Sequence, residues 1–148
     1  MEYTVNQIKN SFKIVRELIL QTSAEEAEFK ARPEKWSKKQ ILGHLCDSAI
    51  NNLQRFTEVQ YESKPYKIMG YKQDELVLAN DYQHAPIEQI LNLWLALNTQ
   101  IIALIINQTN ETLQYEIIIG AELKTLRWLM EDYATHLHHH VKQLTNKC

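Results

Sequence analysis

The sequence has 148 residues, of which 45% are hydrophobic and 23% are charged, and its formal net charge is −2 at pH 7. This length suits one domain over residues 1–148, and the composition argues against a disordered or fibrous chain. Because charges of both signs are mixed throughout, neither nucleic acid nor an anionic membrane is expected as a partner.

Two cysteines, Cys46 and Cys148, are too few for a disulfide framework, and Cys46 lies in an apolar helical pattern where it would act as a small hydrophobe. The N-terminus shows no basic segment followed by an uninterrupted apolar stretch, so no signal peptide is expected. The longest aliphatic run, residues 101–106, is too short to cross a bilayer. These features predict a cytoplasmic protein without a membrane partner.

Three helical segments are predicted in the first part of the chain. Thr4 and Gln7 resemble a capping box that opens a first helix, whose apolar residues continue at helical spacing to about residue 19. Ser23, followed by Glu26, predicts a short second piece that ends before residue 33. A third helix begins after Ser37 and runs to about residue 61, with Gln40 completing its capping box and His44 within it.

Residues 65–84 mix polar and aromatic side chains, which predicts an irregular connection with one or two helical turns in YKQDELVLAND. Pro86 is expected as the first residue of a helix that ends near Asn107, because the N–H that proline lacks would be unsatisfied there. After a loop from Gln108, the letters EIII before Gly120 predict a short extended piece.

The last helix is predicted from about Leu123 to Thr145, where apolar residues recur at coiled-coil-like spacing. Four amphipathic helices of about 15 to 25 residues, with no convincing strand pattern, indicate an all-α protein folded as a four-helix bundle. Two connections are long enough to cross the bundle, so a simple alternating helix order is not assured.

Four of the six histidines lie within the letters HLHHH of this last helix. His136 and His140 are one helical turn apart, which stacks two imidazoles on one face where they can share a metal ion. Rotation by about 100° per residue places His140 near the centre of the apolar stripe and His136 at its edge. The same rotation turns His138 and His139 away from that stripe.

The third helix offers one more imidazole at a distance in the sequence. There His44, Ser48, Asn51 and Arg55 form a polar stripe along the border of the apolar face, so His44 is expected to face a cavity. Neutral imidazole is a good ligand for zinc, nickel or iron(II), and a bundle interior lets two helices present ligands to each other. Three such ligands leave an open position, at which a water molecule or thiol would become more acidic.

Other interpretations of these histidines remain open at this point. A single His44 is often a partly buried histidine with satisfied hydrogen bonds, and a histidine-rich end can be a purification tag. The tract could also bind metal adventitiously at the surface. Against a tag, eight residues follow His140 and continue the amphipathic pattern.

Three segments, WSKKQILGHLCDS, YKQDELVLAND and TLRWLMEDYATHLHHHVKQL, resemble the DinB-like superfamily of small four-helix metalloproteins, which includes thiol S-transferases. The resemblance implies that His44, His136 and His140 bind a divalent metal, usually zinc or nickel, with iron or manganese as alternatives. It also implies a bundle with long crossover connections, whose middle two helices run in the same direction, and a homodimer.

Five further polar residues are candidates for holding an imidazole N–H or for contacting a substrate. Three lie on the helices near the histidines, and two lie in a connection that, in the similar family, passes near the open end of the site. The alternative is that each is an ordinary polar residue at the margin of the bundle or in a solvated loop. These candidates are Asn51, Asp132, Gln143, Tyr71 and Asp74.

Two classes of function follow. One is a metal-dependent enzyme, in which a low-molecular-weight thiol is bound as thiolate and attacks an electrophile, or in which an activated water molecule hydrolyses an amide or ester. The other is a non-catalytic, stress-related bundle that binds a metal or another ligand. The fourth coordination position separates them, because a protein side chain there would indicate a structural site.

Overall fold

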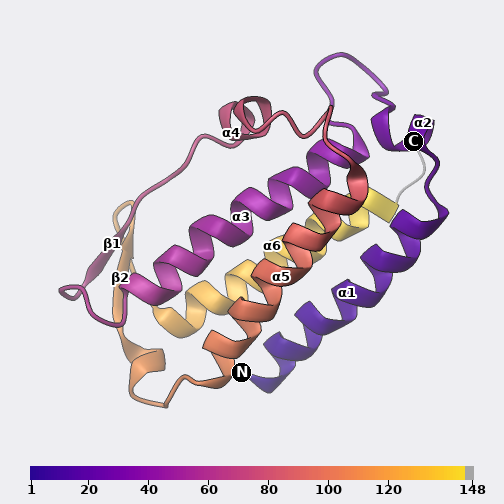
Figure 1. Cartoon of the computed structure of the whole chain (residues 1–148). Helices are drawn as coiled ribbons and strands as arrows, with labels where there is room; N and C mark the ends of the chain where they lie inside the picture. The colour runs from indigo at the N-terminus through magenta and orange to yellow at the C-terminus, as the bar shows by residue number, and fades with distance from the viewer. Residues whose placement is uncertain (146–148) are drawn as a thin grey trace.

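The computed structural model describes residues 1–145, so Cys148 lies outside the described residues. Four long helices form a bundle in which α1 packs on α5 and α6, and α3 packs on the same two helices (Figure 1). The predicted four-helix bundle is therefore confirmed. The long helices are α1 (Glu2–Gln21), α3 (Lys38–Glu58), α5 (Ile87–Ile106) and α6 (Leu126–Thr145).

The middle two helices run in the same direction. In Figure 1, α1 and α6 run from the end of the bundle that holds the N-terminus towards the other end, whereas α3 and α5 run back. The connection over residues 59–86 therefore has to travel the length of the bundle. Of the two connections that were long enough to cross, the second, over residues 107–125, stays at one end.

Two of the predicted helix starts are confirmed in detail. Ser23 caps α2 (Ala24–Glu28), and Ser37 caps α3. In each case the serine hydroxyl accepts a bond from a backbone N–H three residues later, and the side chain at that position accepts one from the backbone N–H of the serine. Such caps satisfy N–H groups that have no partner within the helix. The cap of α3 fixes the start of the helix that carries His44.

Two other starts differ from the prediction. Helix α1 begins at Glu2 with Met1 as its N-cap, so Thr4 is a buried residue inside the helix and the predicted capping box is wrong. Pro86 is the N-cap of α5 rather than its first residue. Both starts move by only one to three residues, and neither changes the face that the helix buries.

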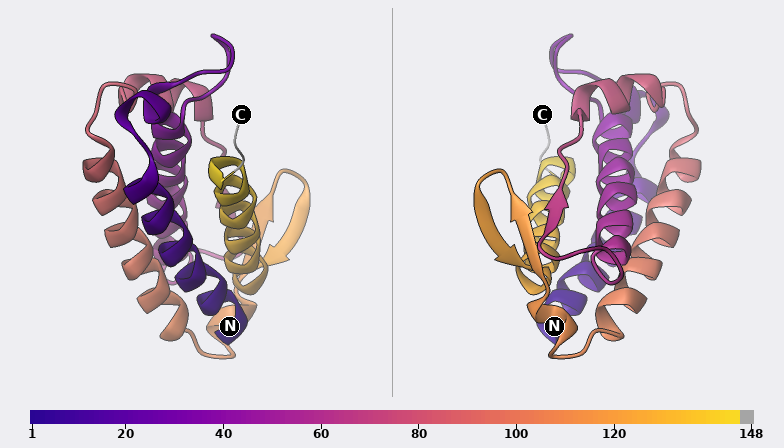
Figure 2. Two further views of the ribbon diagram at one scale, coloured as in Figure 1. Left: turned by 90° about the vertical axis from the view of Figure 1, so that its right-hand side faces the viewer. Right: turned by 90° about the vertical axis from the view of Figure 1, so that its left-hand side faces the viewer.

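A small sheet lies beside the bundle and was largely missed from the sequence. Its strands are β1 (Tyr66–Ile68), β2 (Glu116–Ile119) and β3 (Glu122–Thr125), with β2 parallel to β1 and antiparallel to β3. Figure 2 shows the hairpin of β2 and β3 beside α6. The extended piece EIII is confirmed, but residues 123–125 belong to β3 and not to the last helix. Two short helices, α4 (Gln73–Ala79) and η1 (Thr112–Gln114), complete the connections.

Helix α5 is the most apolar of the four long helices. Within the described residues it is the one helix long and apolar enough, by length and composition, to cross a membrane. A helix at the centre of a bundle can have the same composition. Trp94 and Ile101 of α5 are fully buried, and the helix contacts both α1 and α3.

Candidate functional site

His44 lies inside the bundle, on the second turn of α3. We expected His44 to face a cavity. Its side chain is instead 0% exposed and lies in the buried core, so that expectation is wrong. The ring of Trp36, which stands just before the N-cap of α3, packs against the imidazole with 4.8 Å between the ring centroids. Trp36 thus helps to hold the His44 ring in one orientation.

His136 and His140 of α6 meet His44 from the neighbouring helix. The ring centroid of His140 is 4.5 Å from that of His136 and 4.5 Å from that of His44, and the third pair is 5.4 Å apart. One nitrogen from each ring can be chosen so that all three lie within 4.8 Å of one another. Two helices therefore bring together three imidazoles, although His44 and His136 are 92 residues apart in the sequence.

One pair of the nitrogens is spaced as a bound metal would require. The Nε2 atoms of His44 and His140 are 3.2 Å apart. Two nitrogens bound at the zinc–nitrogen distance of about 2.0–2.1 Å in a tetrahedron would be about 3.3 Å apart. Nε2 of His136 is buried and has no hydrogen-bond partner among residues 1–145, so no protein group competes with a metal for this atom. The three residues fit a divalent ion.

Burial keeps these imidazoles neutral. Desolvation, reinforced by the neighbouring histidines, lowers the pKa of His44 to about 3 and that of His140 to about 4. Desolvation also lowers the pKa of His136. A neutral imidazole has a free lone pair, so all three side chains are in the form that binds a metal at neutral pH.

Gln143 orients one of the three rings. Its Oε1 accepts a hydrogen bond of 2.8 Å from Nδ1 of His140, which leaves the lone pair of that imidazole on Nε2, the atom facing His44. The Gln143 amide nitrogen lies 3.1 Å from Nε2 of His139. His138 and His139 are both exposed, as the helical rotation predicted.

A cavity of about 410 Å³ adjoins the histidines. His136 forms part of its wall, so the cluster and the cavity share one imidazole. The other walls come from α3, from the connection after β1, from the β2–β3 hairpin and from the first half of α6. The remaining lining residues are Ser48, Asn52, Arg55, Ile68, Gly70, Tyr71, Gln73, Ile119, Gly120, Trp128, Leu129, Asp132 and Tyr133.

The structure separates the five further candidates. Asp132 and Tyr71 line the cavity, and Gln143 contacts His140. Partial burial raises the pKa of the Asp132 carboxyl, which is the one acidic group in the cavity wall. By contrast, Asn51 donates to the backbone oxygen of Asp47, and Asp74 is exposed in the first turn of α4. The structure does not bring these two residues to the cavity.

Asn52 was not identified from the sequence, although Ser48 and Arg55 were placed beside His44 on the polar stripe. The spacing of His44, Ser48, Asn52 and Arg55 is four, four and three residues, which is the repeat of one helix face. This pattern could have favoured Asn52 over Asn51. No pattern in the sequence indicated the contact of Trp36 with His44, because Trp36 precedes the helix and does not share its repeat.

A buried polar contact fixes the crossover connection next to His44. The carboxyl of Asp47 accepts hydrogen bonds of 2.7 Å from the hydroxyl of Tyr82 and 2.8 Å from the amide of Asn80. The Tyr82 ring lies directly against Gly43, where an added Cβ would come within 2.1 Å of it. Gly43 therefore permits the close approach of this connection to α3.

Cys46 takes no part in the site. Its side chain is fully buried and donates a hydrogen bond to the backbone oxygen of Ile90. Burial raises the pKa of the thiol to about 12. This confirms the interpretation of Cys46 as a small buried residue and not a nucleophile.

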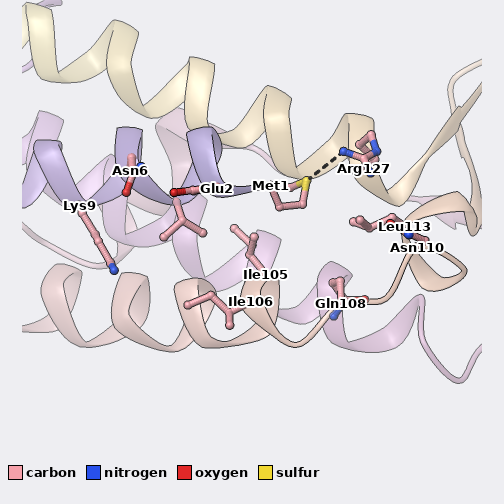
Figure 3. Close-up of a pocket in the computed structure, with 11 residues that line it drawn as sticks. Met1, Glu2, Asn6, Lys9, Ile105, Ile106, Gln108, Asn110, Leu113 and Arg127 are labelled. Carbon is pink, nitrogen blue, oxygen red and sulfur yellow. Dashed lines mark hydrogen bonds between the residues drawn. The ribbon is translucent and has the colours of Figure 1, made fainter.

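A second cavity, of about 490 Å³, lies near the N-terminus of α1 (Figure 3). It is bounded by the last turn of α5, the residues after it and Arg127 of α6, at the end of the bundle away from the three histidines. No histidine or cysteine lines it. Its composition does not suggest metal chemistry.

Solved structures with the same fold include two from Bacillus subtilis. YfiT, described as a probable metal-dependent hydrolase with an unusual four-helix bundle topology, has a TM-score of 0.86 and 21% identity over 97% of this chain and 83% of that chain. The DinB-like protein YjoA has a TM-score of 0.66 and 18% identity, with 96% and 86% covered.

A mycothiol-dependent maleylpyruvate isomerase also shares the fold. Its TM-score is 0.73 at 12% identity, and the match covers 97% of this chain and 60% of that chain. At these identities the similarity shows the fold alone. No curated protein matches the sequence.

The sequence pattern of the DinB superfamily matches residues 7–144. The matched range includes nearly the whole described chain and all three clustered histidines. This agrees with the helix directions and with the position of the cluster between α3 and α6. The chain belongs to the DinB superfamily.

Proposed function

We propose that His44, His136 and His140 bind one divalent metal ion and that the protein is a metal-dependent enzyme for a small molecule. The observation that carries this proposal is that His136 belongs both to the cluster and to the wall of the cavity. A molecule in the cavity would therefore reach the open side of the site. Within the described chain, no fourth histidine, cysteine or carboxylate joins the group.

The all-imidazole donor set is suited to zinc, nickel or iron, and manganese is an alternative that rests on the resemblance to the family. Such an ion acts as a Lewis acid and lowers the pKa of a thiol or water molecule that it binds. The protein supplies the geometry. Gln143 fixes the ring of His140, Trp36 packs on His44, and burial keeps both imidazoles neutral.

The favoured reaction is transfer of a low-molecular-weight thiol. The thiol would lose its proton to solvent, and its sulfur would form a bond to an electrophilic carbon, from which a leaving group departs with the bonding electrons. A structural neighbour that depends on mycothiol supports this class of substrate. The pocket itself provides no thiol nucleophile, since Cys46 lies in the core with a raised pKa.

Hydrolysis of an amide or ester is the second candidate, because one observation favours it. Asp132 lies one helical turn before His136, lines the cavity and has a raised pKa, as a general base for water requires. YfiT, which has the same fold, is described as a probable hydrolase. Asp132→Asn separates the two reactions, since it should lower hydrolysis by roughly 10²-fold or more and leave thiol transfer largely intact.

The test begins with untagged protein, its metal content by elemental analysis, and loading with zinc or nickel. Consumption of glutathione or cysteine is then followed with chlorodinitrobenzene, and ester hydrolysis with nitrophenyl acetate. His140→Ala should abolish activity, whereas His138→Ala, an exposed residue two positions away, should retain it. Metal-loaded protein that accelerates neither reaction would favour the non-catalytic, stress-related bundle. A homodimer and a cytoplasmic location stay predictions.

A further inference from the structure

Arg55 places a guanidinium in the wall of the cavity without an acidic partner. It lies on the last two turns of α3, is half-buried, and is the one lysine or arginine that lines this cavity. None of the ion pairs formed within residues 1–145 includes it. Desolvation accordingly lowers the pKa of the guanidinium from its ordinary value. A partly desolvated cation of this kind is normally matched by an anion.

The guanidinium is also held in place. One terminal nitrogen donates to Oδ1 of Asn52 and the other donates to the backbone oxygen of Met69, while the Tyr71 ring centroid lies 5.3 Å from the guanidinium carbon. An arginine side chain has five N–H groups, so three of them have no acceptor within the described chain. The Arg55 guanidinium is thus held in one orientation and still has N–H groups that can donate to a ligand.

The second cavity offers a comparison. Arg127 lines that cavity (Figure 3), and its guanidinium lies 3.8 Å from the carboxylate of Glu131, one turn further along α6. Its charge is therefore partly balanced by the protein itself. Arg55 has no such neighbour, although both arginines are partly buried at cavity walls.

Arg55 and His136 both line the cavity, and along α3 Arg55 lies far from the histidine cluster. His44 and Arg55 are separated by 11 residues of α3, which corresponds to about 16 Å along the helix axis. Ser48 lies between them on the same face, is 1% exposed, and its hydroxyl has no hydrogen-bond partner within residues 1–145. A polar lining thus continues from the metal site towards the guanidinium.

We propose that the substrate carries a carboxylate, which binds to Arg55 while the reacting group lies at the three histidines. This inference rests on the proposed function. Because the side chains of Arg55 and His136 both line the cavity, the ligand would span on the order of 10 Å between its two ends. A planar guanidinium with free N–H groups matches a carboxylate better than a point charge does.

Matched thiols can test the inference on zinc-loaded protein. The probes are ω-mercapto-octanoate and ω-mercapto-octanol, which differ only in the terminal group, and the shorter pair ω-mercaptobutanoate and ω-mercaptobutanol. Dissociation constants are measured by calorimetry. The longer acid should bind about tenfold or more tightly than the longer alcohol. The shorter acid should show little preference, because it cannot reach Arg55 from the metal site.

Variants then show which residue causes the preference for ω-mercapto-octanoate over ω-mercapto-octanol. Arg55→Met should abolish it without changing the zinc content or the affinity for ω-mercapto-octanol. Arg55→Lys, which keeps the charge and loses the fork, should retain only part of it. The matched control is Arg127→Met in the second cavity, which should leave the preference intact. If Arg55→Met does not fold, the affinities of the two thiol pairs for the wild type and for Arg55→Lys still test whether Arg55 binds the carboxylate.

Equal affinity of both long thiols for the wild type, or a preference that survives in Arg55→Met, would overturn the assignment of Arg55 and leave the metal site standing. Failure of both thiols to bind would instead contradict the proposed function. In that case the same comparison with octanoate and octanol, which lack the thiol, tests Arg55 alone. An octanoate preference that Arg55→Met removes would support the carboxylate site, and its absence would refute it.

Discussion

Gln143 accepts a hydrogen bond from Nδ1 of His140, and this bond directs the lone pair of His140 Nε2 towards Nε2 of His44, 3.2 Å away. Two neutral lone pairs cannot face each other at this distance without repulsion. Without a metal, Nε2 of His44 must therefore carry the proton, and its buried Nδ1 then lacks a partner within residues 1–145. A metal ion bound between the rings would take the place of that proton and bind both nitrogens.

The first prediction concerns which histidines bind metal. His44→Ala, His136→Ala and His140→Ala should each lose most of the tightly bound metal, because each removes one of three ligands that converge on one point. His138→Ala is the matched control, since this exposed neighbour should leave the content almost unchanged. Equal losses in all four variants, measured by elemental analysis after dialysis, would indicate adventitious binding to the histidine tract.

His44→Ala should also reveal the metal as a cross-link between α3 and α6. In the presence of metal, the wild type should gain about 2.7 kcal/mol when the free ion is 100 times its dissociation constant, and the variant should not. After chelation a smaller loss should remain, because His44 is 0% exposed and its truncation leaves a cavity against Trp36. Denaturant unfolding with and without chelator measures both. A variant whose stability still rises with metal as in the wild type would refute the three-histidine site.

Gly43→Ala should destabilise the protein by about 1–3 kcal/mol, because the new Cβ would overlap the ring of Tyr82. That ring cannot move freely, since its hydroxyl is bonded to the buried Asp47. Gly70→Ala is the control, because a Cβ at Gly70 would meet nothing within 4 Å. Thermal unfolding of the two variants should therefore differ. Similar midpoints would mean that the crossover connection is not closely packed on α3.

Asp47 predicts a pH dependence of stability. Desolvation raises the pKa of Asp47 in the folded protein above its unfolded value, so the protonated form is favoured on folding. The stability from this group is therefore present at low pH and is lost as pH rises through the folded pKa. Asp47→Asn has no charge to bury, so its stability relative to the wild type should increase from about pH 4, the unfolded pKa of an aspartate, towards neutral pH.

Urea unfolding of both proteins across this range isolates the effect, because all other titrating groups are common to the pair. A difference in unfolding free energy that stays constant, or that falls as pH rises, would contradict the prediction. In that outcome the bonds from Tyr82 and Asn80 would outweigh the desolvation of Asp47.

The parts of the fold that could be predicted depend on local sequence. The capping boxes at Ser23 and Ser37 join residues three apart, and the inward position of His136 and His140 follows from helical rotation. The direction of the middle helices came from the resemblance to the family. The features that were predicted correctly therefore depend either on residues close together within one helix or on the pattern of the family.

The parts that were missed depend on distant contacts. Strand β1 has three residues and pairs with β2 about 50 residues later, so no local repeat indicates it. The complete burial of His44 needs Trp36, which lies outside the helix. The role suggested for Arg55 needs the cavity, whose walls come from four separate segments.

The crossover connection does two things at once. By running the length of the bundle it allows α3 and α5 to point the same way, and with Gly70, Tyr71 and Gln73 it forms one wall of the cavity. The three histidines, however, stand on α3 and α6. Changes of sequence in this connection can therefore alter which molecules enter, while the chemistry at the helices is inherited unchanged.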